Sequence, residues 1–323
     1  MEANNISYQN ITGTSNISLA QNNYPSLPLL SVGRNFLNNV SDSNSIAGQL
    51  SFSDLSKRLQ STSLKLTDKF VSLDGKRVSY KAMRTSPDFD AFVALSEQLR
   101  FLSLEELIQL DDRQKIAFFS NIYNSLIIHA TCVLGSPADS PSARGDFFSG
   151  RSGAKYLIAN LPFSPDDIEH GILRANLPHP SSPHALSFFN SSDTLRSSLA
   201  IKVENFDPRI HFILNCGASS CPPIKILSSE NLEEALSAAA AGYLASEVHV
   251  DESEKILRLP KLLFWYGKDF GSNLEEILIK VVKMMRNISS VRATIDSILT
   301  KGTLAEYKVE YNPYDWTLNE SED

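Results

Sequence analysis

The feature that most constrains the fold of this chain is the apolar segment IAFFSNIYNSLIIHA, within residues 112–134. A helix that is apolar nearly all round its circumference has to be buried inside a core. Asp111 and Asp112 precede the segment, and acidic residues there complement the positive end of a helix dipole. We therefore predict a buried helix from about Asp112 to Leu134.

Polar side chains interrupt this helix at helical spacing. Asn121, Ser125 and His129 follow one another at four-residue intervals, with Asn124 beside them, so they share one stripe. A buried amide without a partner costs about 1–3 kcal/mol. The stripe either bonds to nearby backbone, which we favour, or lines a cleft. Asn121, Asn124 and Tyr123 are the candidate cleft residues.

Other segments predict an α+β fold. Helical periodicity in residues 87–110, the strong propensity of ENLEEALSAAAAGYLA and a capping box from Ser272 to Glu275 predict helices. In SPDDIEHGILR, Ser164 is a good N-cap and Pro165 fits the first helical position. A turn is expected around Asp74-Gly75, a strand in KILRL, and a strand in the tail before an aromatic anchor.

The predicted organisation is one helix-rich α+β domain over residues 52–319, with a small mixed or antiparallel sheet. Residues 1–50 are rich in Asn and Ser and poor in periodic apolar residues, so we expect a disordered polar tail.

Composition excludes several partners. The net charge of −7 comes with no basic run, which argues against nucleic acid and anionic membranes. Apolar runs such as KLLFWYG and SAAAAGYLA fall short of the ~20 residues of a membrane helix. The N-terminus lacks the features of a secretory signal, and three cysteines are too few for a disulfide framework. We expect a cytoplasmic protein without a cofactor, whose partner is an unknown small molecule or protein.

The block DPRIHFILNCGASSCPP gathers the reactive side chains. Cys216 is a candidate nucleophile and His211 a candidate base, with Arg209 as a nearby cation and Gly217 permitting oxyanion donors. The residues that would orient the histidine are Asn124, Glu169, Asn215 or Asp315.

One objection to this site is geometric. IHFILN reads as a buried strand, in which His211 and Cys216 point to opposite faces unless the chain bends at residues 215–217. Cys221, beyond the turn, escapes that objection. The alternatives are that both cysteines are small buried residues at a turn, that they form a redox-switched disulfide, or that they make a weak zinc site with His211.

Five segments together resemble the domain of unknown function 547. They are FSNIYNSLIIHA, DIEHGILR, DPRIHFILNCGASSCPP, LLFWYGKDF and YDWTLN, in that family's order and spanning nearly the whole chain after the tail. One departure is Phe119-Ser120, where the family pattern has a tryptophan before the Asn-x-Tyr-Asn segment. The resemblance implies a fold and shared motifs but no reaction.

The sequence is compatible with two functional hypotheses. One is a cysteine-dependent hydrolase or acyl transferase, with Cys216 as nucleophile, His211 as base and Asn124 or Glu169 as orienter. The other is a non-catalytic binding or scaffold module whose polar residues are structural. The enzyme hypothesis expects a His211 nitrogen within about 4 Å of a cysteine sulfur.

Residues outside the cysteine block have simpler expected roles. His179 and His184 are expected to be solvated in a loop, and His249 to lie in a surface hairpin. Asp269 and Asp315 are expected to cap a turn or to pair with Arg174 or Arg209. Two aromatic pairs are expected to act as packing anchors: Trp265-Tyr266 and Tyr314-Trp316.

Overall fold

Helix α5 (Asp112–Leu134) lies at the centre of the structure and confirms the predicted buried helix. Asp111 caps it, because its side chain accepts from the Gln114 backbone N–H while the Gln114 side chain accepts from the Asp111 N–H. This reciprocal pair satisfies two donors that a helix start leaves unpaired. The computed structural model describes residues 36–39, 50–137, 140–182, 184–285 and 290–321, and residues 34–323 form one compact unit.

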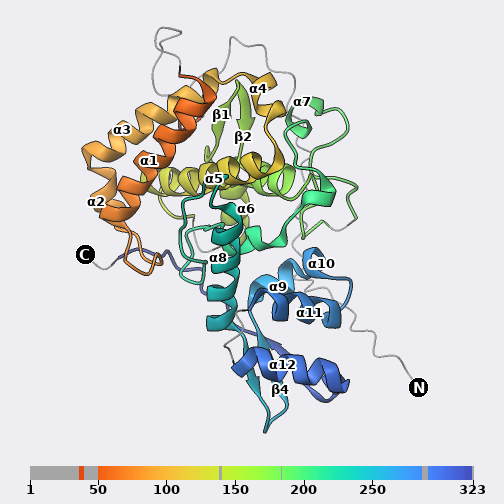
Figure 1. Ribbon diagram of the computed structural model, residues 1–323. Coiled ribbons are helices and arrows are strands. Elements are labelled where there is room, and N and C mark those ends of the chain that lie inside the picture. Colours follow the sequence, from red (N-terminus) through yellow and green to blue (C-terminus); the bar gives the residue numbers. More distant parts are fainter. Residues whose placement is uncertain (1–35, 40–49, 138–139, 183, 286–289, 322–323) are drawn as a thin grey trace. The chain divides into compact units, whose positions relative to one another are not determined.

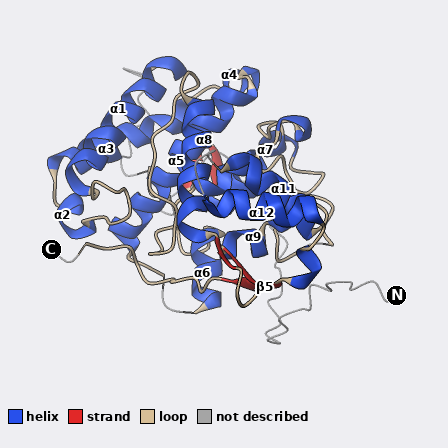
Figure 2. Ribbon diagram, turned by 60° about the horizontal axis from the view of Figure 1, so that its bottom comes forward, coloured by secondary structure: helices blue, strands red, loops and turns tan. Residues whose placement is uncertain are grey.

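Helices make up most of the described chain, as Figure 2 shows. Around α5 lie α1 (Phe52–Phe70), α2 (Tyr80–Arg84), α3 (Pro87–Ser96), α4 (Leu104–Gln109), α6 (Pro141–Phe148) and α7 (Thr194–Ser197). Later in the chain come α8 (Leu232–Glu247), α9 (Lys261–Trp265), α10 (Gly267–Phe270), α11 (Leu274–Met284) and α12 (Ser290–Lys301). A π-helix spans Asp167–Leu173, and 3-10 helices span Glu97–Phe101, Val203–Asn205, Pro208–Phe212 and Leu304–Glu306.

The strands form two small sheets. Strands β1 (Tyr156–Ile158) and β2 (Leu161–Phe163) make an antiparallel pair. In the second sheet β4 (Ile256–Leu259) lies between β3 (His249–Asp251), antiparallel to it, and β5 (Lys308–Tyr311), parallel to it. The predicted α+β class with a small mixed sheet is confirmed.

Helix α5 also has the length and composition of a membrane span, with a mean hydropathy of 1.3 over its best window. Polar residues divide this helix into short apolar runs, so the length of an unbroken run does not mark it as a candidate span. In the structure 83% of that window is buried among other elements, as the core helix of a folded domain would be.

The structure describes residues 36–39 within the segment that the sequence predicts as a polar tail. Residues 1–35 and 40–49 lie outside the described residues, but residues 36–39 are docked on the core. Leu37 is buried, and the fully buried Asn38 side chain donates to the Ser96 and Leu157 carbonyls and accepts from the Leu157 N–H. Such long-range pairing leaves no trace in local composition.

Two local predictions were wrong. The predicted strand IHFILN begins in the 3-10 helix Pro208–Phe212, and none of it lies in a strand. A short apolar run does not reveal its secondary structure by periodicity.

The capping box of α11 is shifted by one residue from the predicted position, because Asn273 rather than Ser272 accepts from the Glu276 N–H.

Candidate functional site

The cysteine block is held in place by the asparagines of α5. Asn124 donates to the Ile213 carbonyl at 3.0 Å and accepts from the Asn215 N–H at 2.8 Å. One turn earlier, Asn121 binds both backbone groups of Leu227 in the same way. These two asparagines therefore bond to backbone, as favoured from the sequence, and Asn124 fixes the chain immediately before Cys216.

The chain turns sharply after Cys216. Gly217 has φ +87°, a conformation that glycine adopts without steric cost. Its N–H donates to the Asn215 side chain, whose amide group donates to the Pro222 carbonyl. The bend at residues 215–217 that a His211–Cys216 pair would require is present, and it brings Cys221 back beside Cys216.

The C-terminal segment 314–319 closes over this turn. Ser219 N donates to the Thr317 carbonyl at 2.8 Å, and Asn319 N donates to the Gly217 carbonyl at 2.9 Å. Asp315 is exposed and bonds to Thr317 and to Ser220. This segment places the Tyr314 hydroxyl against both sulfur atoms.

The two thiols form the closest reactive pair of the site. Their Sγ atoms lie 2.9 Å apart, and the Tyr314 hydroxyl lies 3.2 Å from Cys221 Sγ and 3.6 Å from Cys216 Sγ. The backbone N–H of Cys216 also donates to Cys221 Sγ at 3.1 Å. Cys221 is buried, whereas Cys216 is partly exposed.

These contacts shift the pKa values of the two thiols in opposite directions. Burial raises the pKa of Cys221, but hydrogen bonds from Cys216, Tyr314 and backbone N–H groups outweigh it and lower that pKa below its ordinary value. The hydrogen bond to Cys221, together with burial, raises the pKa of Cys216. When the pair loses a proton, Cys221 is therefore the thiol that ionises first.

Aromatic residues separate the thiols from a second polar group. Trp265, Tyr314 and Trp316 pack together with ring centroids 4.7–5.6 Å apart. The next residue, Tyr266, stacks on the His211 ring at 3.9 Å. Trp265 therefore packs against Tyr314, which contacts the thiols, while the neighbouring Tyr266 packs against His211.

His211 belongs to a buried ion-pair network. Its Nε2 lies 2.8 Å from Asp269 Oδ2. Arg174 donates to both oxygens of the same carboxylate, each at 2.8 Å. Burial raises the pKa of Asp269, but the Arg174 and His211 hydrogen bonds outweigh it and lower the pKa to about 2. An ionised Asp269 accepts a hydrogen bond from His211 Nε2.

The π-helix supplies the other side chains of this network. Glu169 accepts from the Tyr266 hydroxyl at 2.7 Å, and His170 Nδ1 lies 3.0 Å from Arg174 Nη1. Gly171 has no room for a side chain, since a Cβ there would lie 2.2 Å from Phe189. Single π-helical turns are frequent at functional sites.

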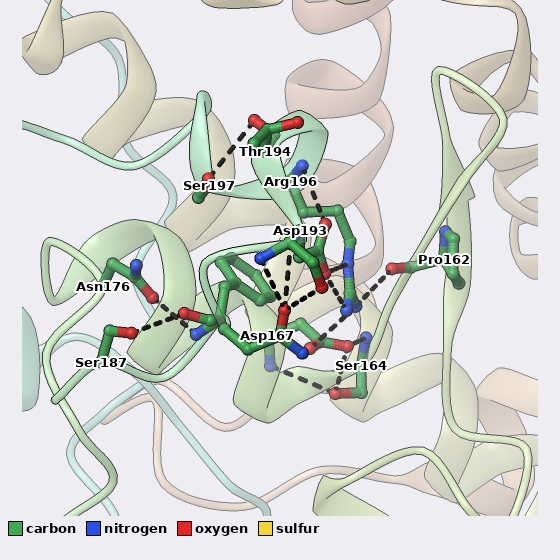
Figure 3. A network of polar contacts seen from close by, with 12 residues as sticks. Pro162, Ser164, Asp167, Asn176, Ser187, Asp193, Thr194, Arg196 and Ser197 are labelled. Carbon is green, nitrogen blue, oxygen red and sulfur yellow. Dashed lines mark hydrogen bonds and ion pairs between the residues drawn. The ribbon is translucent and has the colours of Figure 1, made fainter. Parts of the chain in front are cut away.

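Figure 3 shows how the start of the π-helix is anchored. Ser164 is the predicted N-cap, and its hydroxyl accepts from the Asp167 N–H while Asp167 accepts from the Ser164 N–H. Arg196 lies 3.1 Å from Asp167, pairs with Asp193 and donates to the Pro162 carbonyl. Asp167 is thereby neutralised as part of the scaffold.

The structure brings together some predicted site residues and separates others. No hydrogen bond joins His211 to either cysteine among the described residues. Arg209, the predicted cation of the site, forms ion pairs with Asp207 and Glu233. The zinc set of Cys216, Cys221 and His211 does not come together: within the described parts of the chain, the three-ligand group found is Asp166, His170 and His179. His179, expected to be solvated, instead packs against the buried His170.

Sequence reasoning missed Tyr314 as a thiol contact and Tyr266 as a histidine contact, because both were interpreted as packing anchors. An Asp269–Arg174 pair is among the predicted alternatives, but the sequence does not indicate that it belongs to the site. An unusual density of Glu, His and Arg in an otherwise buried helix, IEHGILR, was the available signal.

The comparisons with known proteins agree with the resemblance. Residues 107–244 match the model of the family described as protein of unknown function, DUF547. The matched segment contains α5, the π-helix and the cysteine block. No curated protein and no solved structure matches the chain.

Proposed function

We propose that the chain acts in thiol–disulfide exchange through Cys216 and Cys221. The observation that carries the proposal is the 2.9 Å separation of the two sulfur atoms. A bonded pair has a sulfur separation of about 2.05 Å, so a shift of under 1 Å closes the disulfide. A hydrolase would need one thiol and a base, whereas this geometry pairs two thiols.

The charge distribution supports a sequence of steps. Cys216 is the more exposed thiol and attacks an external disulfide R–S–S–R′, while the Cys221 thiolate accepts its proton and R′–S⁻ leaves. Cys221 then attacks the Cys216 sulfur and passes its proton to the departing R–S group. The protein loses two electrons and the external disulfide gains them, yielding R′–S⁻ and R–SH.

Tyr314 has a positioning role in this proposal. Its hydroxyl reaches both sulfurs, so it stabilises the thiolate before reaction and lies beside the new bond afterwards. Because it is carried by the C-terminal segment, that segment is required for reactivity as well as for packing.

Glutathione disulfide serves as the probe for the experiment, with modified sites read by intact-protein and peptide mass spectrometry. Cys221→Ser should accumulate a glutathione adduct at Cys216, because no resolving thiol remains. The wild-type chain should resolve the adduct into a Cys216–Cys221 disulfide, and Cys216→Ser should react slowly. Equal adduct levels in the wild type and Cys221→Ser would contradict the proposal.

A second candidate, cysteine-dependent acyl transfer or hydrolysis, is favoured by one observation. Asp269 Oδ2 lies 2.8 Å from His211 Nε2, in the way that a carboxylate orients the histidine base of a catalytic triad. In this alternative p-nitrophenyl acetate acylates Cys216, and His211→Asn abolishes acylation without affecting disulfide formation. A scaffold module would instead leave both cysteines unreactive until the chain unfolds.

A further inference from the structure

We infer that Asp166, His170 and His179 form a binding site for a divalent transition-metal cation, with Zn²⁺ the ion that fits best. One ligand atom from each residue lies within 4.8 Å of the other two. Imidazole nitrogen and carboxylate oxygen are ligands that zinc accepts. The site is separate from the thiol pair, and it does not rest on the proposed exchange reaction.

The local fold presents these ligands together. Asp166 and His170 are four residues apart at the start of the π-helix, with Asp166 Oδ1 3.9 Å from His170 Nε2. His179 returns from the following loop, and its ring centroid lies 4.4 Å from that of His170. Ligands on one tetrahedral zinc are about 3.4 Å apart, so small side-chain rotations complete the set.

The distribution of charged groups around the site favours a bound cation. Arg174 neutralises Asp269, and Arg196 neutralises Asp167. Asp166 and Glu169 have instead the neutral partners His170 and Tyr266. The carboxyl groups of Asp166, Glu169 and Asp269 thus lie in a largely buried group with one guanidinium, that of Arg174, and a bound cation compensates this excess of acidic groups.

Both histidines are available as neutral ligands. Burial lowers the pKa of His170 well below its ordinary value, and burial together with Arg174 lowers that of His179 to about 4. Metal on Nε2 moves the ring proton to Nδ1, where it needs an acceptor. Glu169 Oε1 lies 4.0 Å from His170 Nδ1, and Ser181 Oγ lies 2.6 Å from His179 Nδ1.

Metal binding through Nε2 of both histidines has two structural requirements. The Ser181 backbone N–H donates to His179 Nδ1 at 3.1 Å, so this hydrogen bond has to break when that nitrogen gains the proton. Arg174 Nη1 donates to His170 Nδ1 in this structure, so it has to give way when Nδ1 gains the proton. The same nitrogen also donates to the Pro178 carbonyl at 3.0 Å, which keeps it hydrogen-bonded after the shift. Three protein ligands leave a fourth tetrahedral position for water or a substrate oxygen, the arrangement found in catalytic rather than structural zinc sites.

Zn²⁺ titration of the full chain by calorimetry tests the site. Because thiolates in general also ligate zinc, the decisive protein is Cys216→Ala/Cys221→Ala, which should retain one site. In that background His179→Gln should weaken binding at least about 100-fold and Glu169→Gln about 10- to 100-fold. His184→Gln, in the same loop but exposed, should leave the affinity unchanged and serves as the matched control.

Two outcomes would overturn the inference. The double cysteine variant fails to bind zinc, in which case the thiols are the zinc ligands. Alternatively, His179→Gln and His184→Gln bind with equal affinity, in which case the ion sits elsewhere. Thermal melting of each variant without metal confirms that it is folded, and Asp166→Asn provides a second ligand variant if His179→Gln is unstable.

Discussion

Arg174 and His211 share the carboxylate of Asp269. Both of its oxygens accept from the guanidinium, and Oδ2 also lies 2.8 Å from His211 Nε2. One aspartate thus balances a buried cation and sets which nitrogen of the histidine carries the proton.

Asp269→Asn removes this charge while keeping the size of the side chain. The buried guanidinium is left uncompensated, so the free energy of unfolding should fall by about 3–5 kcal/mol. The exposed pair Lys69–Asp88 is the control, because Asp88→Asn should cost roughly 0–1 kcal/mol. Urea unfolding measures both changes, and equal small losses would show that the Asp269 charge is dispensable.

The reactivity of the thiol pair should depend on Tyr314. Tyr314→Phe removes a hydrogen bond to Cys221 Sγ, so the pKa of the Cys221 thiol should rise. Iodoacetamide labelling of the native chain at each cysteine, followed against pH by mass spectrometry, should show a thiolate below the unperturbed ~8.5 only with Tyr314 present. Unchanged labelling curves in Tyr314→Phe would remove Tyr314 from the site.

Asn124 and Asn121 make equivalent backbone contacts but in different places. Replacing either by Ala leaves buried backbone groups unpaired, so each variant should lose about 2–4 kcal/mol of unfolding free energy. Only Asn124→Ala should also alter cysteine labelling, because only Asn124 holds the backbone next to Cys216. Identical labelling in both variants would contradict this positioning role.

Much of the helical framework follows from the sequence, because α5 and α11 carry long periodic patterns or strong caps and α8 is rich in strong helix formers. Ser164 and Pro165 likewise mark the start of the π-helix. The segment 210–215 was assigned to the wrong element, since a short apolar run fits a strand or a buried turn equally well.

The site itself was only partly predictable. The sequence predicts the cysteine block as the candidate site and includes Glu169 among its candidate residues. The pairing of Arg174 with Asp269 joins residues 95 positions apart, and the Tyr314–Cys221 contact joins residues 93 apart. Local patterns carry no information about such pairs, which is why the neighbours of each reactive group had to come from the structure.

His129 should make stability depend on pH in mildly acidic solution. Burial lowers its pKa from 6.5 to about 4, so the unfolded chain binds the proton more readily than the folded chain. Stability from this residue is present above pH 6.5 and is lost as pH falls towards 4, by about 3 kcal/mol in total. Unfolding free energies of the wild type and His129→Gln, compared between pH 7 and 4, isolate this contribution. Parallel pH curves would rule it out.

The central claim, that Cys216 and Cys221 form a working dithiol, is tested most directly by a redox titration of the folded chain. The protein is equilibrated in glutathione buffers of graded potential, the thiols are trapped with N-ethylmaleimide, and the disulfide is identified by peptide mass spectrometry. We predict a reversible Cys216–Cys221 disulfide with a potential above about −300 mV, the range of labile rather than structural disulfides. Cys132, which is buried and whose pKa burial raises to about 12, should stay reduced throughout. If Cys216 and Cys221 remain thiols under oxidising buffer while the chain stays folded, the account is wrong.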